Sequence, residues 1–263
     1  MIYIVICTTA LLVSGLTLFS GFGLGTLLMP VFALFFPVEV AVAATAMVHG
    51  ANNIFKVLVV GKNADRDLVL RFGIPAVMAA FMGAGALGYV SGFGELFQYA
   101  IGSKTAVITP IKLVMAVLMF VFAMFELLPS LQNLRFDRKH LFLGGLLSGF
   151  FGGLSGHQGA LRSAFLVKTG VSTQAFVGTN AMIGFMVDMA RIATYAGMFF
   201  LAKTDKSPIG SELWPLILSG TAAAFIGVIA GKRWMHKMTM KTIQWLTGFL
   251  LLAIAVALGS GII

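Results

Sequence analysis

The sequence predicts an all-α polytopic membrane protein, with about eight full transmembrane helices and two short broken or re-entrant segments. Of the 263 residues, 59% are hydrophobic and only 10% are charged, whereas a soluble domain carries about 25% charged residues. A single soluble core cannot bury that much apolar surface, so lipid must be the solvent for most of it. Gly, Pro and polar residues divide the apolar sequence into runs of helical length.

Ten apolar runs are the expected helices. A bilayer crossing takes about 20 apolar residues, so the short runs 22–36 and 158–167 are expected to be half-helices or re-entrant segments. The first run lacks a basic flank and is long for a signal peptide, which makes it a helix of the mature protein. The long runs are 2–20, 38–60, 72–91, 107–128, 140–152, 171–202, 213–230 and 242–263.

The two halves of the chain match each other. Both show the order of a long run, a Gly-rich break, a short run, a long run and two further runs. The sequence therefore predicts two homologous repeats in one membrane domain, residues 1–134 and 135–263. A shift of 134 residues superposes Ser14-Gly15 on Ser148-Gly149, Gly25 on Gly159, Leu27 on Leu161, Ala41 on Ala175, and Thr45 on Thr179.

Loop charge predicts how the repeats are oriented. If each short segment returns the chain across the membrane, each half crosses five times, and eleven cations lie on one side and three on the other. If each short segment only extends its neighbour, each half crosses four times, and the split is eight to six. The positive-inside rule favours the first arrangement, which makes the repeats inverted and puts both termini outside, in the periplasm. The eleven are Lys62, Arg66, Arg71, Arg135, Arg138, Lys139, Lys168, Lys232, Arg233, Lys237 and Lys241, against Lys104, Lys203 and Lys206.

Polar residues inside the spans are the functional candidates, because ionisable groups there are costly. In run 38–60 they occupy an arc of roughly 100°, which gives one polar stripe on an apolar helix. The alternative for the lysine is that it only extends to the headgroups. The stripe consists of Thr45, His49, Asn52, Asn53 and Lys56.

Run 171–202, the repeat mate, carries a comparable stripe of Asn180, Asp188, Arg191 and Tyr195. Asp188 and Arg191 are three residues apart and can pair on one helix face. This pair either contributes to a binding site or only holds the helices together.

The Gly-rich breaks form the third group of candidates. A buried helix start offers free N–H groups and a partial positive charge, which suit an anion. Gln158 and Arg162 lie four residues apart beyond the second break, and Arg162 supplies a planar array of donors that matches an oxyanion. Close helix packing is the competing reason for glycines here. The glycines assigned to the site are Gly23, Gly25, Gly156 and Gly159, with His157 beside them.

The balance of membrane-embedded charge predicts the sign of the ligand. Lys56, Lys112, Arg162 and Arg191 outnumber the acids Asp188 and Glu126. A bound anion complements this excess, whereas a cation channel would be lined by acids. No basic patch with interleaved aromatics indicates nucleic acid. No motif indicates a cofactor, a metal or catalysis, so we expect no cofactor and no enzyme activity.

Two motifs resemble the TauE/SafE family of sulfite exporters. They are SGFGLGTLLMP at residues 20–30 and AATAMVHGANNIFK at residues 43–56, and the resemblance extends over essentially the whole chain. It implies an inner-membrane transporter for sulfite, an organosulfonate or another sulfur oxyanion. The family's glycine–proline motif picks out Gly21, Gly23, Gly25 and Pro30, whereas the second half has Gly156-His157-Gln158-Gly159 and Ala164 opposite Pro30.

The sequence thus predicts a secondary transporter that binds a small anion between the two breaks and moves it across the membrane by alternating access. Arg162, Lys56 and backbone N–H groups bind the anion, and Asn52, Asn53, Gln158 and Asn180 complete its hydrogen bonds. His49, His157 or Asp188 carries a coupling proton. The rivals are an anion channel and a membrane enzyme or assembly factor. A homo-oligomer is left open.

Overall fold

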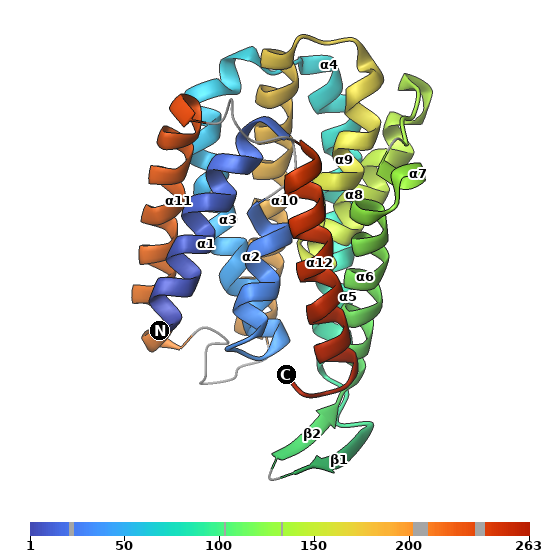
Figure 1. The fold of residues 1–263 in the computed structure, drawn as a ribbon. Helices are drawn as coiled ribbons and strands as arrows, with labels where there is room; N and C mark the ends of the chain where they lie inside the picture. The colour runs from blue at the N-terminus through green and yellow to red at the C-terminus, as the bar shows by residue number, and fades with distance from the viewer. Residues whose placement is uncertain (21–23, 103, 133, 202–209, 235–239) are drawn as a thin grey trace.

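The computed structural model describes residues 1–20, 24–102, 104–132, 134–201, 210–234 and 240–263 (Figure 1). Helices dominate it, which confirms the predicted all-α class. The first half contains α1 (Ile2–Ser20), α2 (Leu24–Ala33), α3 (Val38–Val60), α4 (Arg66–Leu68), α5 (Ile74–Ser91), α6 (Pro110–Leu127) and α7 (Pro129–Gln132). The second half contains α8 (Leu141–Ser155), α9 (Gly159–Leu166), α10 (Thr173–Leu201), α11 (Trp214–Trp234) and α12 (Met240–Gly259).

The helices have the length and apolarity that a bilayer requires. Among the described residues, the continuous spans 38–63, 66–91, 110–127 and 211–231 are long and apolar enough to cross a membrane, and 2–17, 24–33 and 244–259 are shorter apolar helices. Large apolar side chains such as Leu58, Met82 and Ile229 are exposed on the outside of the bundle. Because such a surface is suited to lipid, the chain is a multi-pass membrane protein.

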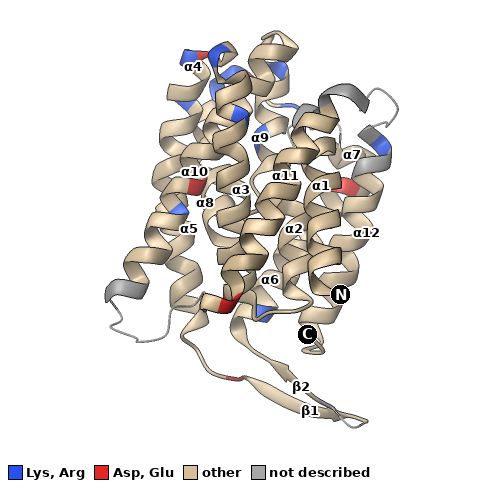
Figure 2. Cartoon of the chain, turned by 90° about the vertical axis from the view of Figure 1, so that its left-hand side faces the viewer, with Lys and Arg blue, Asp and Glu red and all other residues tan. Residues whose placement is uncertain are grey.

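The short helix α2 returns the chain to the end of the bundle where α1 began, and α9 does the same after α8. Figure 1 shows α4 at one end of the bundle, and both termini and the β-strands at the other. Helix α11 ends and α12 begins towards the α4 end. Exposed Lys62, Arg66, Arg71 and Lys168 belong to that end, where Figure 2 shows the basic residues gathered. The chain therefore follows the path that the eleven-to-three charge split favoured.

Two pairs of helices pack in unusually close contact through glycine. A Cβ added at Gly149 of α8 would lie 2.0 Å from the Ala76 carbonyl oxygen of α5, and one at Gly227 of α11 would lie 2.1 Å from the Leu11 oxygen of α1. Only glycine permits such an approach. Under the 134-residue shift, α8 corresponds to α1 and α5 to α11. The two helix pairs, but not the two glycine positions, are therefore equivalent under this shift, and the division into repeats stays a prediction.

Helices α3 and α10 pack on each other, as do α6 and α12. Each of these pairs joins a helix of the first half to its counterpart in the second. Helix α2 is buried along its whole length and packs against α1, α3 and α12. The half-helices and the α3–α10 pair therefore form the interior, and the remaining long helices surround them.

A β-hairpin corrects one sequence prediction. β1 (Phe97–Ile101) pairs antiparallel with β2 (Lys104–Ile108), with Phe97 opposite Ile108, whereas the sequence predicted a helix over 107–128. Helix α6 instead begins at Pro110, after Thr109, whose hydroxyl accepts a hydrogen bond from the Lys112 N–H at 3.3 Å. Proline disfavours helical geometry in the preceding residue and suits the first helical position. The apolar residues before it therefore form a strand.

Candidate functional site

The polar stripe of α3 faces α10 and is buried. His49, Asn53 and Lys56 recur at intervals of four and three residues, which places them on one face of the helix. Their exposed fractions are 1%, 4% and 6%. Gly50 of α3 also contacts α10, because a Cβ there would meet Ile192 and Met189. The stripe is therefore enclosed by the helix that carries the second predicted stripe.

The α3 stripe and the polar residues of α10 form one buried cluster, and Asp188 of α10 is the hydrogen-bond acceptor at its centre. Its Oδ2 lies 2.7 Å from His49 Nδ1 and accepts a hydrogen bond of 2.7 Å from Asn53 Nδ2. Its Oδ1 accepts from Arg191 Nε at 3.0 Å and from Gln158 Nε2 at 3.3 Å. One carboxylate thus joins α3, α10 and the second Gly-rich break.

Arg191 neutralises Asp188 within α10. Its Nη2 lies 2.9 Å from Asp188 Oδ1, and neither side chain is exposed. The guanidinium also reaches α8, where Nη1 is 3.4 Å from the Gly152 carbonyl oxygen. Tyr195, one turn further along α10, donates to the Gly153 carbonyl. The Asp188–Arg191 pair therefore connects α10 to the end of α8, and the charges of the two side chains offset each other.

The second break places Gln158 and Arg162 in the same cluster. Helix α8 stops at Gly156, whose φ of 82° is left-handed and which donates its N–H to the Gly152 carbonyl. Glycine adopts this conformation without strain. Ser148 holds the turn by donating to the Gln158 carbonyl oxygen at 3.0 Å. Gln158 and Arg162 then lie on one face of α9, with exposed fractions of 0% and 3%.

Arg162 binds amides and no carboxylate. Its Nε donates to Asn180 Oδ1 at 2.7 Å, and its Nη1 donates to Gln158 Oε1 at 2.9 Å. Within the described part of the chain, no Asp or Glu oxygen lies within the 4.0 Å of an ion pair with Arg162. Gly184 of α10 leaves room for it, since a Cβ at that position would lie 3.4 Å from Nη1. The guanidinium is therefore buried without a directly paired acid, and Asp188 acts on it only at longer range.

Lys56 adds a second buried cation near Arg162. It interacts electrostatically with Arg162, which repels it, and with Asp188, which attracts it. The cluster thus holds Lys56, Arg162 and Arg191 against Asp188, and Arg191 already pairs with that acid. Among the described residues, neither Lys56 nor Arg162 has an acid within ion-pair distance, and such an excess of buried basic groups suits a bound anion.

The two Gly-rich breaks meet beside this cluster. A Cβ added at Gly25, near the start of α2, would lie 3.3 Å from the Gly156 carbonyl oxygen and 3.8 Å from the His49 ring. Gly159 is the first residue of α9, and no side chain caps that helix start. The packing thus brings Gly25 and Gly156 together, and the predicted role of these glycines in binding stays a prediction. Gly23 lies outside the described residues.

Two predicted site residues point elsewhere. Asn52 accepts a hydrogen bond of 3.0 Å from Ser14 of α1, so it joins α3 to α1. The His157 ring stacks on Phe122 of α6, with 5.2 Å between the ring centres, and its Nδ1 lies 3.1 Å from the Ser155 hydroxyl. Neither residue contacts Asp188 or Arg162, and their predicted roles stay untested.

Sequence reasoning missed two serines that hold the site together. Ser14 positions Asn52, and Ser148 positions the Gln158 backbone. The signal was present, because the 134-residue shift superposes these two serines. No group of three or more His, Cys, Asp or Glu side chains with metal-binding geometry occurs in the ranges that the structure describes.

Comparison with known proteins identifies the family. Residues 6–258 match the family model described as sulfite exporter TauE/SafE. No match was found among curated proteins. Because the family match covers nearly the whole chain, the chain belongs to the TauE/SafE family of membrane transporters, as the motifs indicated.

Proposed function

We propose that this member of the TauE/SafE family is a secondary transporter for a small oxyanion, and that Arg162 is its principal binding group. The observation that carries the proposal is the buried guanidinium that binds two amides and no acid. The family makes sulfite or another sulfur oxyanion the leading substrate class. Organosulfonates present the same negatively charged oxygen atoms and belong to that class.

The hydrogen bonds of Arg162 suggest how the anion is held. A guanidinium has five N–H donors, and two of them serve Asn180 and Gln158. The remaining donors form a planar edge that can bind two oxygens of one oxyanion. Lys56 supplies further charge, and the N–H groups at the start of α9 complete the proposed shell. Asn53 is expected to contribute only if its amide gives up its hydrogen bond to Asp188.

Burial favours alternating access over a continuously open pore. No side chain of the cluster is more than 6% exposed, and Asp188, Arg191 and Gln158 are fully buried. An anion can therefore reach Arg162 only after helices move. Transporters with inverted repeats achieve this by moving one set of helices against another around a central site. The glycine-packed pairs α1–α11 and α5–α8 are natural rigid units for such a motion.

Proton coupling is assigned to the His49–Asp188 pair. The two side chains are 2.7 Å apart and lie 1% and 0% exposed. Histidine exchanges a proton readily near neutral pH, and a proton on this pair changes the net charge beside Arg162. His157 is the weaker candidate because its ring packs on Phe122.

The basic end of the bundle defines the proposed orientation. We place the α4 end in the cytoplasm and both termini in the periplasm, with the chain in an inner membrane. In a Cys7→Ala background, single cysteines placed at residues 62–71 and 232–241 should both be labelled only from the cytoplasmic side. Labelling from opposite sides would reject the inverted arrangement of repeats 1–134 and 135–263.

Reconstitution into liposomes tests the function itself. Labelled sulfite should enter slowly and saturably, and Arg162→Lys should weaken the uptake. An Arg71→Lys variant is the control, because Arg71 is exposed and pairs with Asp67. Fast flux that does not saturate would indicate a channel, and absence of flux for sulfite and every other sulfur oxyanion would reject the proposal.

A further inference from the structure

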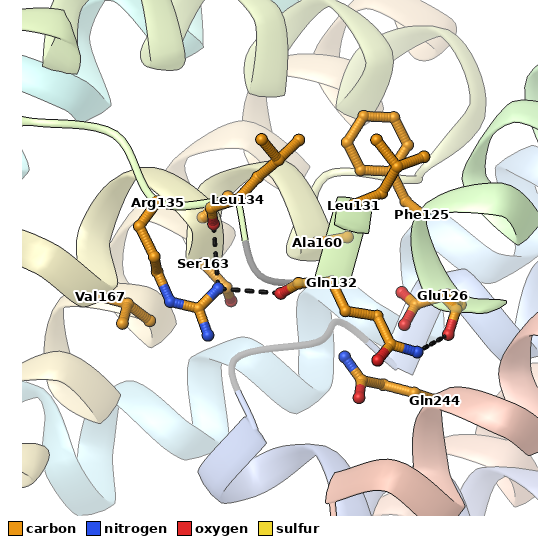
Figure 3. Close-up of a pocket in the computed structure, with 11 residues that line it drawn as sticks. Phe125, Glu126, Leu131, Gln132, Leu134, Arg135, Ala160, Ser163, Val167 and Gln244 are labelled. Carbon is orange, nitrogen blue, oxygen red and sulfur yellow. Dashed lines mark hydrogen bonds between the residues drawn. The ribbon is translucent and has the colours of Figure 1, made fainter. Parts of the chain in front are cut away.

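A separate polar pocket lies on the other side of α9 from Arg162, between α6, α7, α9 and α12 (Figure 3). Its volume is about 100 Å³. Successive helical residues are 100° apart, so Ala160 and Ala164, which line the pocket, point away from Arg162, and Ser163 lies on the flank between them and Arg162. Phe125, Leu131, Leu134 and Val167 form its apolar walls.

Glu126 of α6 gives this pocket an unpaired acid. The side chain is only 1% exposed, and its Oε2 has no hydrogen-bond partner. In the described chain, no Lys, Arg or His lies within ion-pair distance of it. A buried acid without a cation or donor favours its neutral form, and a bound ammonium group would provide the partner that lets it ionise. Ser163 is also buried, at 8% exposed, and its hydroxyl has no partner.

Arg135 gives the same pocket an unpaired base. Its Nη1 donates to the carbonyl oxygens of Gln132 and Leu134, at 3.0 and 2.9 Å. No ion pair joins it to an acid of the described residues. Figure 3 shows the Arg135 guanidinium and the Glu126 carboxyl group on opposite sides of the pocket, with the Gln132 and Gln244 amides near Glu126. Among the described residues, no ion pair joins Arg135 to Glu126.

We propose that this pocket binds a small zwitterion, with its ammonium group at Glu126 and its acidic group at Arg135. A simple anion would leave the buried carboxylate unpaired, and a simple amine would leave the guanidinium unused. A molecule with both charges matches both walls, and a short methylene chain between them suits the apolar lining. The site goes beyond the proposed transport function, because it requires neither Arg162 nor anion movement.

A series of ω-amino acids measures the spacing of the two charges. Glycine, β-alanine, 4-aminobutyrate and 6-aminohexanoate should stabilise the purified protein against thermal unfolding to different extents. One chain length should stabilise most, and should bind at least tenfold more tightly than propionate or propylamine. Equal stabilisation by propionate, or none by any amino acid, would overturn the proposal.

Two variants test the assignment of each end. Glu126→Gln should abolish the preference for the best amino acid over propionate, and Arg135→Gln should abolish its preference over propylamine. Arg135 is exposed, so that substitution leaves folding intact. The controls are Glu39→Gln and Arg138→Gln, exposed residues outside the pocket. Unchanged preferences in both pocket variants would refute the site.

The proposed transport function can fail independently. Arg162→Lys should weaken sulfite binding and leave amino-acid binding as it is in the parent protein. Loss of amino-acid binding in that variant would place the zwitterion at the central cluster and overturn the pocket proposal.

Discussion

Replacing Arg162 with lysine separates charge from geometry at the proposed anion site. Lysine keeps the positive charge but presents a point charge in place of the planar fork. In the parent protein, Nε and one Nη1 hydrogen serve Asn180 and Gln158, which leaves the outer edge of the guanidinium for substrate. The variant loses at least one of the two hydrogen bonds that this edge can make to an oxyanion.

The expected magnitude follows from that loss. A hydrogen bond to a charged group contributes about 1.5–3 kcal/mol, and every 1.4 kcal/mol changes affinity about tenfold. Arg162→Lys should therefore weaken sulfite binding by about ten- to a hundredfold. Asn180 and Gln158 also lose their donor, so the ligand-free variant should unfold at a lower temperature than the parent.

The assay is sulfite-induced thermal stabilisation of the purified protein, measured over a range of concentrations. Each variant is compared with its own ligand-free form, so that a loss of intrinsic stability does not affect the affinity. Arg71→Lys serves as the control. If sulfite stabilises Arg162→Lys and the parent over the same concentration range, the guanidinium is structural and the reasoning is refuted.

Three further outcomes are expected. Lys56→Gln should weaken sulfite binding at least tenfold in the same assay, whereas unchanged affinity would mean that Lys56 only extends to the headgroups. Asp188→Asn should lower the free energy of unfolding by about 3–5 kcal/mol, because Arg191 loses its buried partner. Asp67→Asn, at an exposed pair, should cost about 0–1 kcal/mol, and equal effects in urea unfolding would contradict this account. Gly149→Ala should reduce the yield of folded protein and Gly85→Ala should not, because only the former Cβ meets backbone; equal yields would count against the close α5–α8 contact.

The helical pattern of the sequence predicted most of the fold, because polarity and length are local properties. The long runs became helices, and the short runs at 22–36 and 158–167 became the half-helices α2 and α9. The hairpin at residues 97–108 was missed, because the predicted helix began at residue 107 and included the last two residues of β2, while the residues before it were assigned to no element. Pro110 was the local signal that decided against a helix there.

The sequence predicted which faces of α3 and α10 are polar, but it did not predict which of those side chains contact one another. Asn52 and Asn53 are neighbours on α3, yet one bonds to Ser14 and the other to Asp188. His157 and Gln158 are neighbours too, and they contact α6 and α10 respectively. Which of two adjacent side chains enters the cluster depends on how three helices pack together. A pattern within one helix carries no information about that packing.

The two halves share an architecture but differ in chemistry, and this difference bears on how the anion is bound. The 134-residue shift places Leu28 opposite Arg162, and Leu28 is fully buried in α2. The first break therefore contributes backbone and shape, whereas the second contributes a charge. In the α3–α10 pair the first half contributes the unpaired basic residue, Lys56 of α3. The second half contributes only the Asp188–Arg191 ion pair of α10, in which the two charges offset each other. In the proposed site, a ligand between the breaks would be held by Arg162 of α9 on one side and by Lys56 of α3 on the other. Relative motion of α9 and α3 would pull its two cationic contacts apart, which links release of the anion directly to the rearrangement of the half-helices.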